Sequence, residues 1–492
     1  MSQIQTSKMT NYRWVICAML FLATTVNYMD RQVLSLTYPG TGGIQEEFGW
    51  SDDNYGTITG IFSIAYALCN LFAGKFIDWM GTKKGYLWAI FIWSTGAVIH
   101  AFCAIATSGI LTGSWIEGFE GAKEILREFK ASGAADAGLA ISTVSMWLFL
   151  GCRCILALGE AGNFPAAIKV TAEYFPKKDR AFATAIFNSG ASVGALIAPF
   201  TIPVIAKFFG WEMAFIVIGA LGYVWMLFWV ILYKKPQECD RVNEAERLYI
   251  LQDSENEETE NTEEEDEKPI SFLKCLTFRQ TWSFMVGKFM TDGVWWFFLF
   301  WTPAYLSSQF GINPSDNLGI VLIFVLYLIT MLSILGGKLP TVFINRGMNA
   351  YAGRMRAMFI FALFPLAGLF AQPLGGIFNT PWFPVILIGI IGAAHQSWSA
   401  NIFSTVGDMF PKSTIATITG LGTFAGGVGS FIINQGAGKL FTYAEETNLH
   451  ALGFEGKPAG YMIIFCICAV AYLIGWMIMK LLVPRYKPVV AE

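Results

Sequence analysis

Residues 211–233 read WEMAFIVIGALGYVWMLFWVILY, an apolar stretch with a single carboxylate, Glu212, near its start. About a dozen stretches of about 18 to 25 mainly apolar residues recur along the chain, and each can cross a hydrocarbon core roughly 30 Å thick as a helix. They make the 492 residues 54% hydrophobic and only 14% charged, with a mean hydropathy of +0.50. This composition excludes a water-soluble enzyme.

The stretches predict an all-α membrane protein with twelve transmembrane helices. We expect the first six near residues 13–37, 54–77, 85–107, 141–165, 181–206 and 211–233. We expect the second six near residues 281–303, 318–345, 355–372, 382–409, 415–440 and 459–483. The hydrophilic stretches between them are too short for a separate catalytic domain, so the function must reside in the membrane bundle.

A repeated motif divides the twelve helices into two pseudo-symmetric bundles of six. Phe175-Pro176-Lys177 ends the fourth predicted span, Phe410-Pro411-Lys412 ends the tenth, and a glycine follows at the same distance from each proline. Halves related in this way are typical of transporters whose substrate site lies between them, near the membrane midplane. We expect the two bundles at residues 1–233 and 279–492.

The segment between the bundles, residues 234–278, is expected to be a cytoplasmic linker. Its centre, Asp253 to Glu267, holds ten carboxylates and no Lys or Arg, so it cannot bury apolar surface and should be flexible. Lys and Arg gather instead in alternate short loops, which the positive-inside rule places in the cytoplasm together with both termini. The prediction is a multi-pass protein of the inner (plasma) membrane.

Residues 108–140 form an external insert with apolar side chains at helical spacing, namely Trp115, Phe119, Leu126 and Phe129. We expect an amphipathic helix that packs on the bundle or on the lipid interface.

The nine cysteines sit mostly inside apolar segments, which indicates neither a disulfide framework nor a metal site, and no cofactor is expected.

Ionisable side chains at membrane depth point to the functional site, because each costs at least roughly 2.5–3.5 kcal/mol to insert. The first span carries Asn27, Asp30 and Arg31. The fourth carries Arg153 and Glu160, two turns apart on one face. Two interpretations remain open. Either the charges are salt bridges that fasten two helices, or the carboxylates carry protons and the arginines, released by protonation, hold an anion.

The second half offers further polar groups at membrane depth. Lys288 and Asp292 are one turn apart in the seventh span, so the lysine is either neutralised by Asp292 or a second cationic contact for substrate. In the tenth span, His395, Gln396 and Asn401 are candidates for hydrogen bonds to a hydroxyl-rich ligand. The same cluster would also suit hydrogen bonding between helices.

The residues after the second predicted span resemble the signature of the major facilitator superfamily. Those that fit it are Gly74, Asp78, Gly81 and Lys84. Trp79 departs from it, and in the second half Thr341 stands where an aspartate is expected. The resemblance implies the two-bundle major facilitator fold, with Asp78 and Lys84 in a gate that the second half does not match.

More specifically, the chain resembles the anion:cation symporter family and, within it, the hexuronate transporters. The match is carried by Asn27 to Arg31, Arg153 to Pro165, Asn188 to Pro199, Lys288 to Tyr305 and Ala394 to Asn401. This resemblance implies Asp30 and Glu160 as proton carriers, and Arg31, Tyr66 and Arg153 as substrate ligands.

The function expected on these grounds is proton-coupled import of a hexuronate, such as glucuronate or galacturonate, by alternating access in a monomer. Neither enzymatic chemistry nor nucleic-acid binding is expected. In relatives that carry aldonates, glutamines align with Lys288 and Ala191, so these two positions favour a uronate. The alternatives are a symporter for another organic anion, such as an aldonate, and a transporter-like nutrient sensor. Proton and sodium coupling are not distinguished by the sequence.

Overall fold

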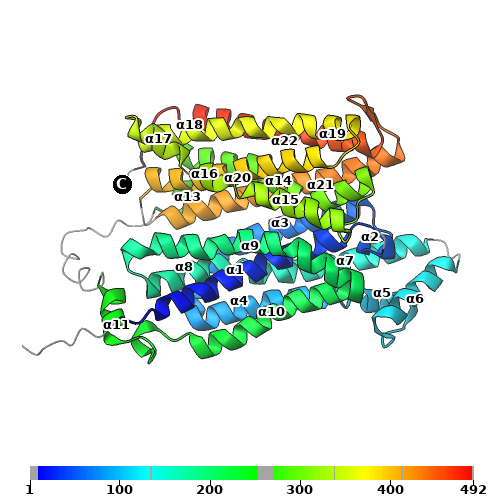
Figure 1. The fold of residues 1–492 in the computed structure, drawn as a ribbon, viewed down its shortest axis with the longest axis horizontal. Coiled ribbons are helices and arrows are strands. Elements are labelled where there is room, and N and C mark those ends of the chain that lie inside the picture. Colours follow the sequence, from blue (N-terminus) through cyan, green and yellow to red (C-terminus); the bar gives the residue numbers. More distant parts are fainter. Residues whose placement is uncertain are drawn as a thin grey trace, which may run out of the picture.

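The computed structural model describes residues 9–40, 42–132, 136–252, 270–336, 338–411 and 414–489. The acidic run predicted to be a flexible tether, Asp253 to Glu267, lies outside these residues. Long helices run roughly side by side in two layers (Figure 1). The helices from α1 to α10 form one layer and those from α13 to α22 form the other.

The first layer follows the predicted N-terminal spans. Its helices are α1 (Tyr12–Thr37), α2 (Ile44–Phe48), α3 (Asp52–Met80), α4 (Thr82–His100), α5 (Cys103–Thr112), α6 (Gly118–Ala131), α7 (Ala137–Glu160), α8 (Asn163–Tyr174), α9 (Lys177–Phe209) and α10 (Trp211–Leu232). After it come the short 3-10 helix η1 (Pro236–Glu238) and α11 (Glu244–Leu251), which belong to the predicted linker.

The second layer follows the predicted C-terminal spans. Its elements are α13 (Phe272–Cys275), α14 (Arg279–Phe310), α15 (Asn317–Thr330), α16 (Ser333–Gly336), α17 (Leu339–Asn345), α18 (Ala350–Leu363), η2 (Phe364–Ala367), α19 (Gly368–Ile377), α20 (Trp382–Met409), α21 (Ile415–Glu446) and α22 (Lys457–Leu482). A two-residue hairpin, β1 (His450–Ala451) with β2 (Phe454–Glu455), connects α21 to α22.

The prediction of twelve membrane-length segments is confirmed, although several are not single straight helices. By length and composition alone, seven helices within the described residues could cross a membrane, and the bent pair α4–α5 would be an eighth. Its two parts meet at 55°. The helices α1, α14 and α21 are absent from these seven, and the first two carry most of the ionisable residues singled out above. The helices α1 and α14 are less hydrophobic than α10 and α22, which marks these two as helices of the interior.

The two layers are fastened together at the end of the bundle where α2, α6 and the hairpin lie, which we call the far end. Lys457 of α22 pairs with Asp52 of α3 at 2.5 Å, and Tyr55 donates a hydrogen bond of 2.7 Å to the Phe300 carbonyl. A side chain on Gly56 would lie 2.6 Å from the Asn434 carbonyl oxygen. The glycine therefore allows α3 and α21 to approach backbone to backbone at this end.

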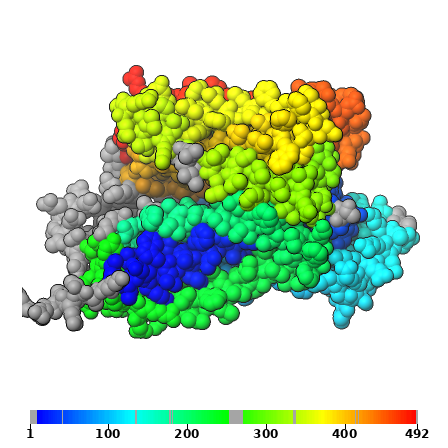
Figure 2. All heavy atoms as spheres, in the orientation of Figure 1, coloured from blue at the N-terminus to red at the C-terminus, as the bar shows by residue number. Residues whose placement is uncertain are grey.

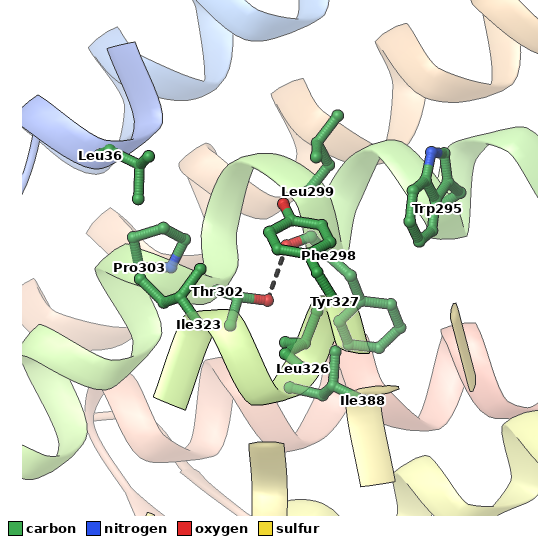
Figure 3. A pocket seen from close by; sticks show the side chains of 10 residues that line it. All are labelled: Leu36, Trp295, Phe298, Leu299, Thr302, Pro303, Ile323, Leu326, Tyr327 and Ile388. Atoms are coloured by element: carbon green, nitrogen blue, oxygen red, sulfur yellow. Dashed lines mark hydrogen bonds between the residues drawn. The ribbon is translucent and has the colours of Figure 1, made fainter. Parts of the chain in front are cut away.

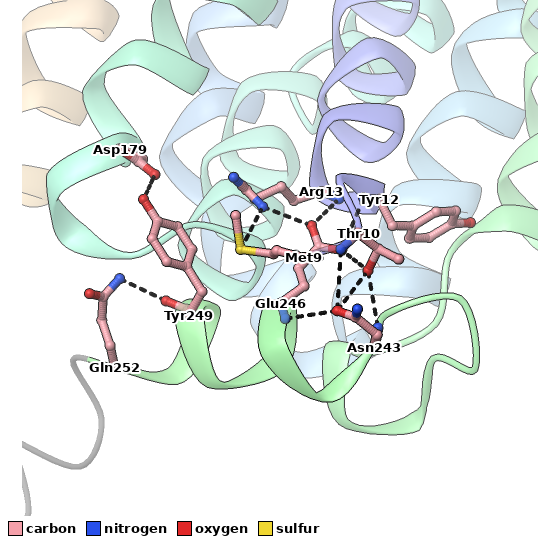
Figure 4. A network of polar contacts seen from close by, with 9 residues as sticks. All are labelled: Met9, Thr10, Tyr12, Arg13, Asp179, Asn243, Glu246, Tyr249 and Gln252. Carbon is pink, nitrogen blue, oxygen red and sulfur yellow. Dashed lines mark hydrogen bonds and ion pairs between the residues drawn. The ribbon is translucent and has the colours of Figure 1, made fainter. Parts of the chain in front are cut away.

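At the opposite end, where the C-terminus lies, part of the linker is bound to the first layer (Figure 4). Glu246 of α11 is fully buried, pairs with Arg13 at 3.0 Å and accepts a hydrogen bond of 2.6 Å from Thr10. Tyr249 donates to Asp179 at the start of α9, at 2.7 Å. The linker composition did not predict this ordered contact, because its strong acidity conceals the apolar and pairing residues at its N-terminal end.

The segment after α22 is bound to the second layer, as part of the linker is bound to the first. The Val489 amide donates to the Met409 carbonyl at 2.8 Å, and the Gln280 side chain donates to the Lys487 carbonyl at 2.9 Å. These bonds tie the C-terminal segment to the ends of α14 and α20. Each layer is therefore capped by the chain that follows its last long helix.

The insert between α5 and α7 packs on the bundle and projects at the far end (Figure 2, cyan). Leu126 of α6 is buried, and Lys123 reaches Glu212 of α10 at 3.0 Å. Glu47 of α2 accepts a hydrogen bond of 2.8 Å from the Trp211 indole. The predicted amphipathic helix is thus present as α6, although Trp115 precedes it and is exposed, and buried polar contacts from α2, α6 and α10 hold the helix in place.

The first prediction concerns the pH dependence of this anchorage. Burial raises the pKa of Glu47 to about 7. Because the folded state binds this proton more tightly than the unfolded state, the stability contributed by Glu47 is complete below its unfolded pKa and declines as the pH rises through about 7. We expect hydrogen exchange of residues 118–131 to accelerate between about pH 5 and about pH 8 beyond the intrinsic chemical increase, and Glu47→Gln to remove this excess.

Glu46→Gln is the matched control, because Glu46 is an exposed neighbour on the same short helix. It should leave the pH dependence as in the wild type. An unchanged pH dependence in Glu47→Gln would assign the effect to another group.

Candidate functional site

The polar residues of α1 lie where the two layers meet. Asn27, Asp30 and Arg31 are 0%, 2% and 4% exposed, although they follow one another within about one turn of a long helix. Three ionisable or amide side chains so deeply buried require partners or ligands, because an unsatisfied buried polar group costs about 1–3 kcal/mol. The partners of Arg31 come from α7, α3 and the opposite layer.

Arg31 is the centre of the arrangement. Its Nε donates to Glu160 Oε2 at 2.7 Å, which joins α1 to the end of α7. The guanidinium carbon lies 4.4 Å from the ring centre of Tyr66 on α3 and 5.4 Å from that of Trp296 on α14. Arg31 therefore contacts two other helices of its own layer, α3 and α7, and faces an aromatic ring of the other layer.

Arg153 does not pair with Glu160, although both lie on one face of α7. Seven residues correspond to roughly 10 Å along a helix, so the shared face does not bring the two groups into contact. The Arg153 guanidinium instead lies 5.3 Å from the ring centre of Phe62. The structure thus brings Glu160 to Arg31, a partner that helical spacing within one span could not identify.

Several polar atoms around this pair lack a hydrogen-bond partner within the described part of the chain. They are both side-chain atoms of Asn27, both carboxylate oxygens of Asp30, Arg31 Nη2, Arg153 Nη1 and Glu160 Oε1. Donors and acceptors are both present, so the cluster can receive an anion on its guanidinium groups and protons on its carboxylates. Asn27 lies one helical turn before Arg31 on α1, and both polar atoms of its side chain are free for a ligand among the described residues.

In the second layer, Lys288 and Asp292 of α14 form a local ion pair of 2.7 Å. The Lys288 ammonium also lies 4.4 Å from the Phe403 ring centre. Their spacing of one turn allows this contact. This contact is the neutralisation of Lys288 by Asp292 that the sequence offered as one alternative. The ammonium is thus paired within its own helix.

The three candidate residues of α20, His395, Gln396 and Asn401, differ in their contacts and burial. His395 Nδ1 lies 2.7 Å from the Tyr472 hydroxyl, and its ring stacks on Trp295 with 5.2 Å between ring centres. Asn401 donates to the Ser397 carbonyl of its own helix at 2.8 Å, and Gln396 is half-buried. Of the three, His395 has the most extensive contacts with other helices.

A small cavity lies beside this cluster but is unsuitable for an anion (Figure 3). Its lining comes from α1, α14, α15 and α20 and consists of Leu36, Trp295, Phe298, Leu299, Thr302, Pro303, Ile323, Leu326, Tyr327 and Ile388. The Thr302 hydroxyl is already bonded to the Phe298 carbonyl at 2.6 Å. No charged side chain lines the cavity, so it offers no cationic group for an anion.

Residues 20–122 and 131–434 match the family model of the Major Facilitator Superfamily. The chain belongs to this superfamily. Its members are transporters rather than enzymes, and the predicted fold class is thereby confirmed.

Individual relatives and solved structures agree with this assignment. The chain is 29% identical to the hexuronate transporter of Escherichia coli (strain K12) over 84% of each chain. It is 25% identical to the D-galactonate transporter of Escherichia coli O6:H1 over 99% of each chain. Its fold is similar to that of a crystallised D-xylose-proton symporter, with a TM-score of 0.66 at 14% identity, covering 95% of this chain and 98% of that one.

The superfamily signature spans the end of α3 nearest the termini and the start of α4. Asp78 pairs there with Lys169 of α8 at 2.6 Å, whereas Lys84 is exposed and belongs to no ion pair among the described residues. In the second half, Arg354 of α18 pairs with Asp408 of α20 at 2.7 Å. Sequence reasoning missed this second-half pair, although the acid stands three residues before the proline of the repeated motif, as Glu173 does in the first half.

The second prediction tests whether Lys288 and Asp292 depend on one another. Asp292→Asn leaves a buried ammonium without its counter-charge, and losing one partner of such a pair typically costs about 3–5 kcal/mol. The double variant Lys288→Met/Asp292→Asn should recover most of that loss, because both charges are removed. Thermal unfolding of the detergent-solubilised proteins measures the effect.

Asp240→Asn, in the exposed Lys234–Asp240 pair, is the control and should change the unfolding temperature little. Equal unfolding temperatures for Asp292→Asn and the wild type would show that Lys288 has another counter-charge.

Proposed function

We propose that this protein is a proton-coupled symporter that imports a sugar-acid anion, specifically a hexuronate such as glucuronate or galacturonate. The observation that carries the proposal is the position of Arg31, which pairs with a buried carboxylate and lies against aromatic rings of both layers. Transport then proceeds by alternating access, as residues 1–233 move against residues 279–492 in a monomer of the inner membrane.

The substrate carboxylate binds to the arginines of the first layer. A guanidinium presents parallel donors that match a carboxylate, and Arg31 and Arg153 each have a buried nitrogen that no described residue satisfies. Glu160 competes for Arg31, because it occupies the Nε donor. Protonation of Glu160 weakens that competition and makes the guanidinium available to the substrate.

Tight substrate binding therefore requires that the cluster takes up a proton. Asp30 and Glu160 are the two carboxylates of the cluster, and both have oxygens without a donor among the described residues. The cluster of Asp30, Arg31, Arg153 and Glu160 holds two negative and two positive charges, so an added carboxylate is electrostatically compensated when one acid takes up a proton. Asp30 and Glu160 are accordingly assigned as the proton-coupling acids.

The sugar part of the substrate lies between the aromatic rings and the polar residues of the second layer. Tyr66 and Trp296 approach one another at 5.9 Å between ring centres, across the layer interface. Such rings suit the apolar face of a sugar, and His395, Gln396 and Asn401 supply hydrogen-bonding groups. Lys288 becomes a substrate contact when its bond to Asp292 is exchanged for one to the ligand.

The far-end contacts support a conformation that is closed on the external side. With both termini assigned to the cytoplasm, the Asp52–Lys457 pair closes the external side. Loading from outside requires this contact and the close approach at Gly56 to open. Asp78 and Lys84 then belong to the gate on the cytoplasmic side, where Asp78 is at present bound to Lys169.

The choice of a hexuronate is supported by the relatives, which include a hexuronate transporter and a galacturonate transporter at 29% and 27% identity. An aldonate carrier and a sensor without net flux are the competing functions. Uptake of labelled galacturonate into proteoliposomes, with a panel of uronates, aldonates and aldarates as competitors, separates them. Imposing a proton gradient or a sodium gradient in turn identifies the coupling ion, and no accumulation under either gradient would contradict symport.

The third prediction concerns Glu160. Glu160→Gln keeps a hydrogen-bonding oxygen beside Arg31 but cannot exchange a proton, so accumulation driven by a pH gradient should be lost while substrate exchange continues. Glu246→Gln is a matched control, because Glu246 is also fully buried and paired with an arginine of α1. It should accumulate substrate as the wild type does. Full accumulation by Glu160→Gln would remove this residue from the coupling mechanism.

The fourth prediction concerns the arginines. Lysine cannot reproduce the planar fork of a guanidinium, so Arg31→Lys and Arg153→Lys should each weaken the apparent affinity by about tenfold or more, which corresponds to roughly 1.4 kcal/mol. Arg13→Lys tests the same substitution in a buried pair outside the site and should leave the affinity unchanged. Wild-type affinity in both site variants would make Arg31 and Arg153 structural residues.

A further inference from the structure

His395 is held by contacts from two other helices. Its Nδ1 lies 2.7 Å from the hydroxyl of Tyr472 on α22, and that hydroxyl in turn donates to the Thr291 carbonyl of α14 at 3.3 Å. Trp295 stacks on the imidazole with an interplanar angle of 1°. The ring orientation is therefore fixed by the stack, and its hydrogen bonding is determined by Tyr472.

A count of hydrogen atoms decides between the two neutral forms of the imidazole. A carbonyl oxygen only accepts, and the Tyr472 hydroxyl has one hydrogen. If the hydroxyl gives that hydrogen to Thr291, its oxygen accepts from Nδ1–H, and two hydrogen bonds form. If it gives the hydrogen to Nδ1 instead, only one forms. Because a buried hydrogen bond stabilises by about 0.5–1.5 kcal/mol, the first arrangement is favoured.

The other ring nitrogen then has a free lone pair. Nε2 has no hydrogen bond to a described residue, and unlike Nε2 of His100 it is not fully enclosed by protein atoms. In the favoured arrangement Nε2 carries no hydrogen and can only accept. An acceptor suits a hydroxyl group and repels a carboxylate, whose oxygens also only accept.

We propose that Tyr472 is a positioning residue that holds His395 with its hydrogen on Nδ1, so that Nε2 accepts a hydrogen bond from a hydroxyl group of the substrate. The inference rests on the proposed function for the class of substrate. It divides recognition between the two layers: the arginines of the first layer bind the carboxylate, and His395 of the second layer reads a hydroxyl.

Nitrogen-15 NMR of histidine-labelled protein tests the ring state without any substrate. The chain has three histidines, which single substitutions assign. His100 is an internal reference, because its Nδ1 lies 2.6 Å from the Gly96 carbonyl oxygen and must carry the hydrogen. In the wild type, His395 should show the same nitrogen pattern as His100. In Tyr472→Phe it should shift towards the form with hydrogen on Nε2.

Binding of deoxy sugar acids tests the consequence for recognition. Among galacturonates lacking one hydroxyl each, one should bind the wild type at least tenfold more weakly than the parent. In Tyr472→Phe this difference should become smaller, because Nε2–H cannot accept from that hydroxyl and can meet it only as a donor, in a site arranged for the opposite direction. Tyr305→Phe, which removes a buried hydroxyl bonded to Gln372, is the control and should keep the wild-type ratio.

Three results would overturn the proposal. One is a wild-type His395 with hydrogen on Nε2. Another is a Tyr472→Phe protein with an unchanged nitrogen pattern. The third is a galacturonate series in which every deoxy analogue binds the wild type as the parent does. If no uronate binds at all, the proposed function fails, and the NMR result still decides the state of the ring.

Discussion

The positive charge of a guanidinium buried inside a membrane protein must be compensated, and this requirement determines how the side chains at the centre of the molecule are arranged. Arg31 is paired with Glu160 at 2.7 Å, with neither side chain more than 5% exposed. Removing either partner would leave a buried charge alone, at a cost of several kcal/mol. The end of α7 is consequently held against α1, and the aromatic rings of Tyr66 and Trp296 cover the remaining faces of the guanidinium.

The same requirement explains which helices lie inside. The helices α1 and α14 carry the ionisable residues and are less apolar than the helices on the outside, such as α10 and α22. A polar helix is stable in a bilayer when its polar groups face other helices, and this places α1 and α14 at the layer interface. Small residues have a related role at the far end, where Gly56 lets α3 and α21 meet with no side chain between them.

The sequence predicted the features that depend on composition and local spacing. Twelve membrane-length segments follow from hydropathy, and the proximity of Lys288 and Asp292 follows from their separation of one helical turn. Contacts between distant segments were not predictable in the same way. The sequence offered salt bridges between the first and fourth spans as one interpretation, but it did not single out Arg31 as the partner of Glu160 or Lys169 as the partner of Asp78, because tertiary packing determines which charges meet.

The two segments that cap the ends of the layers have a consequence for how the chain can be divided. The chain after α10 returns to α1 through the Arg13–Glu246 pair, and the chain after α22 returns to α20 through the Val489 amide. Among the described residues, the segment that ends each layer is bonded to helices of its own layer. A polypeptide cut between Gln252 and Ile270 would give two fragments, each with its own cap, whose association would rest on the contacts between the layers.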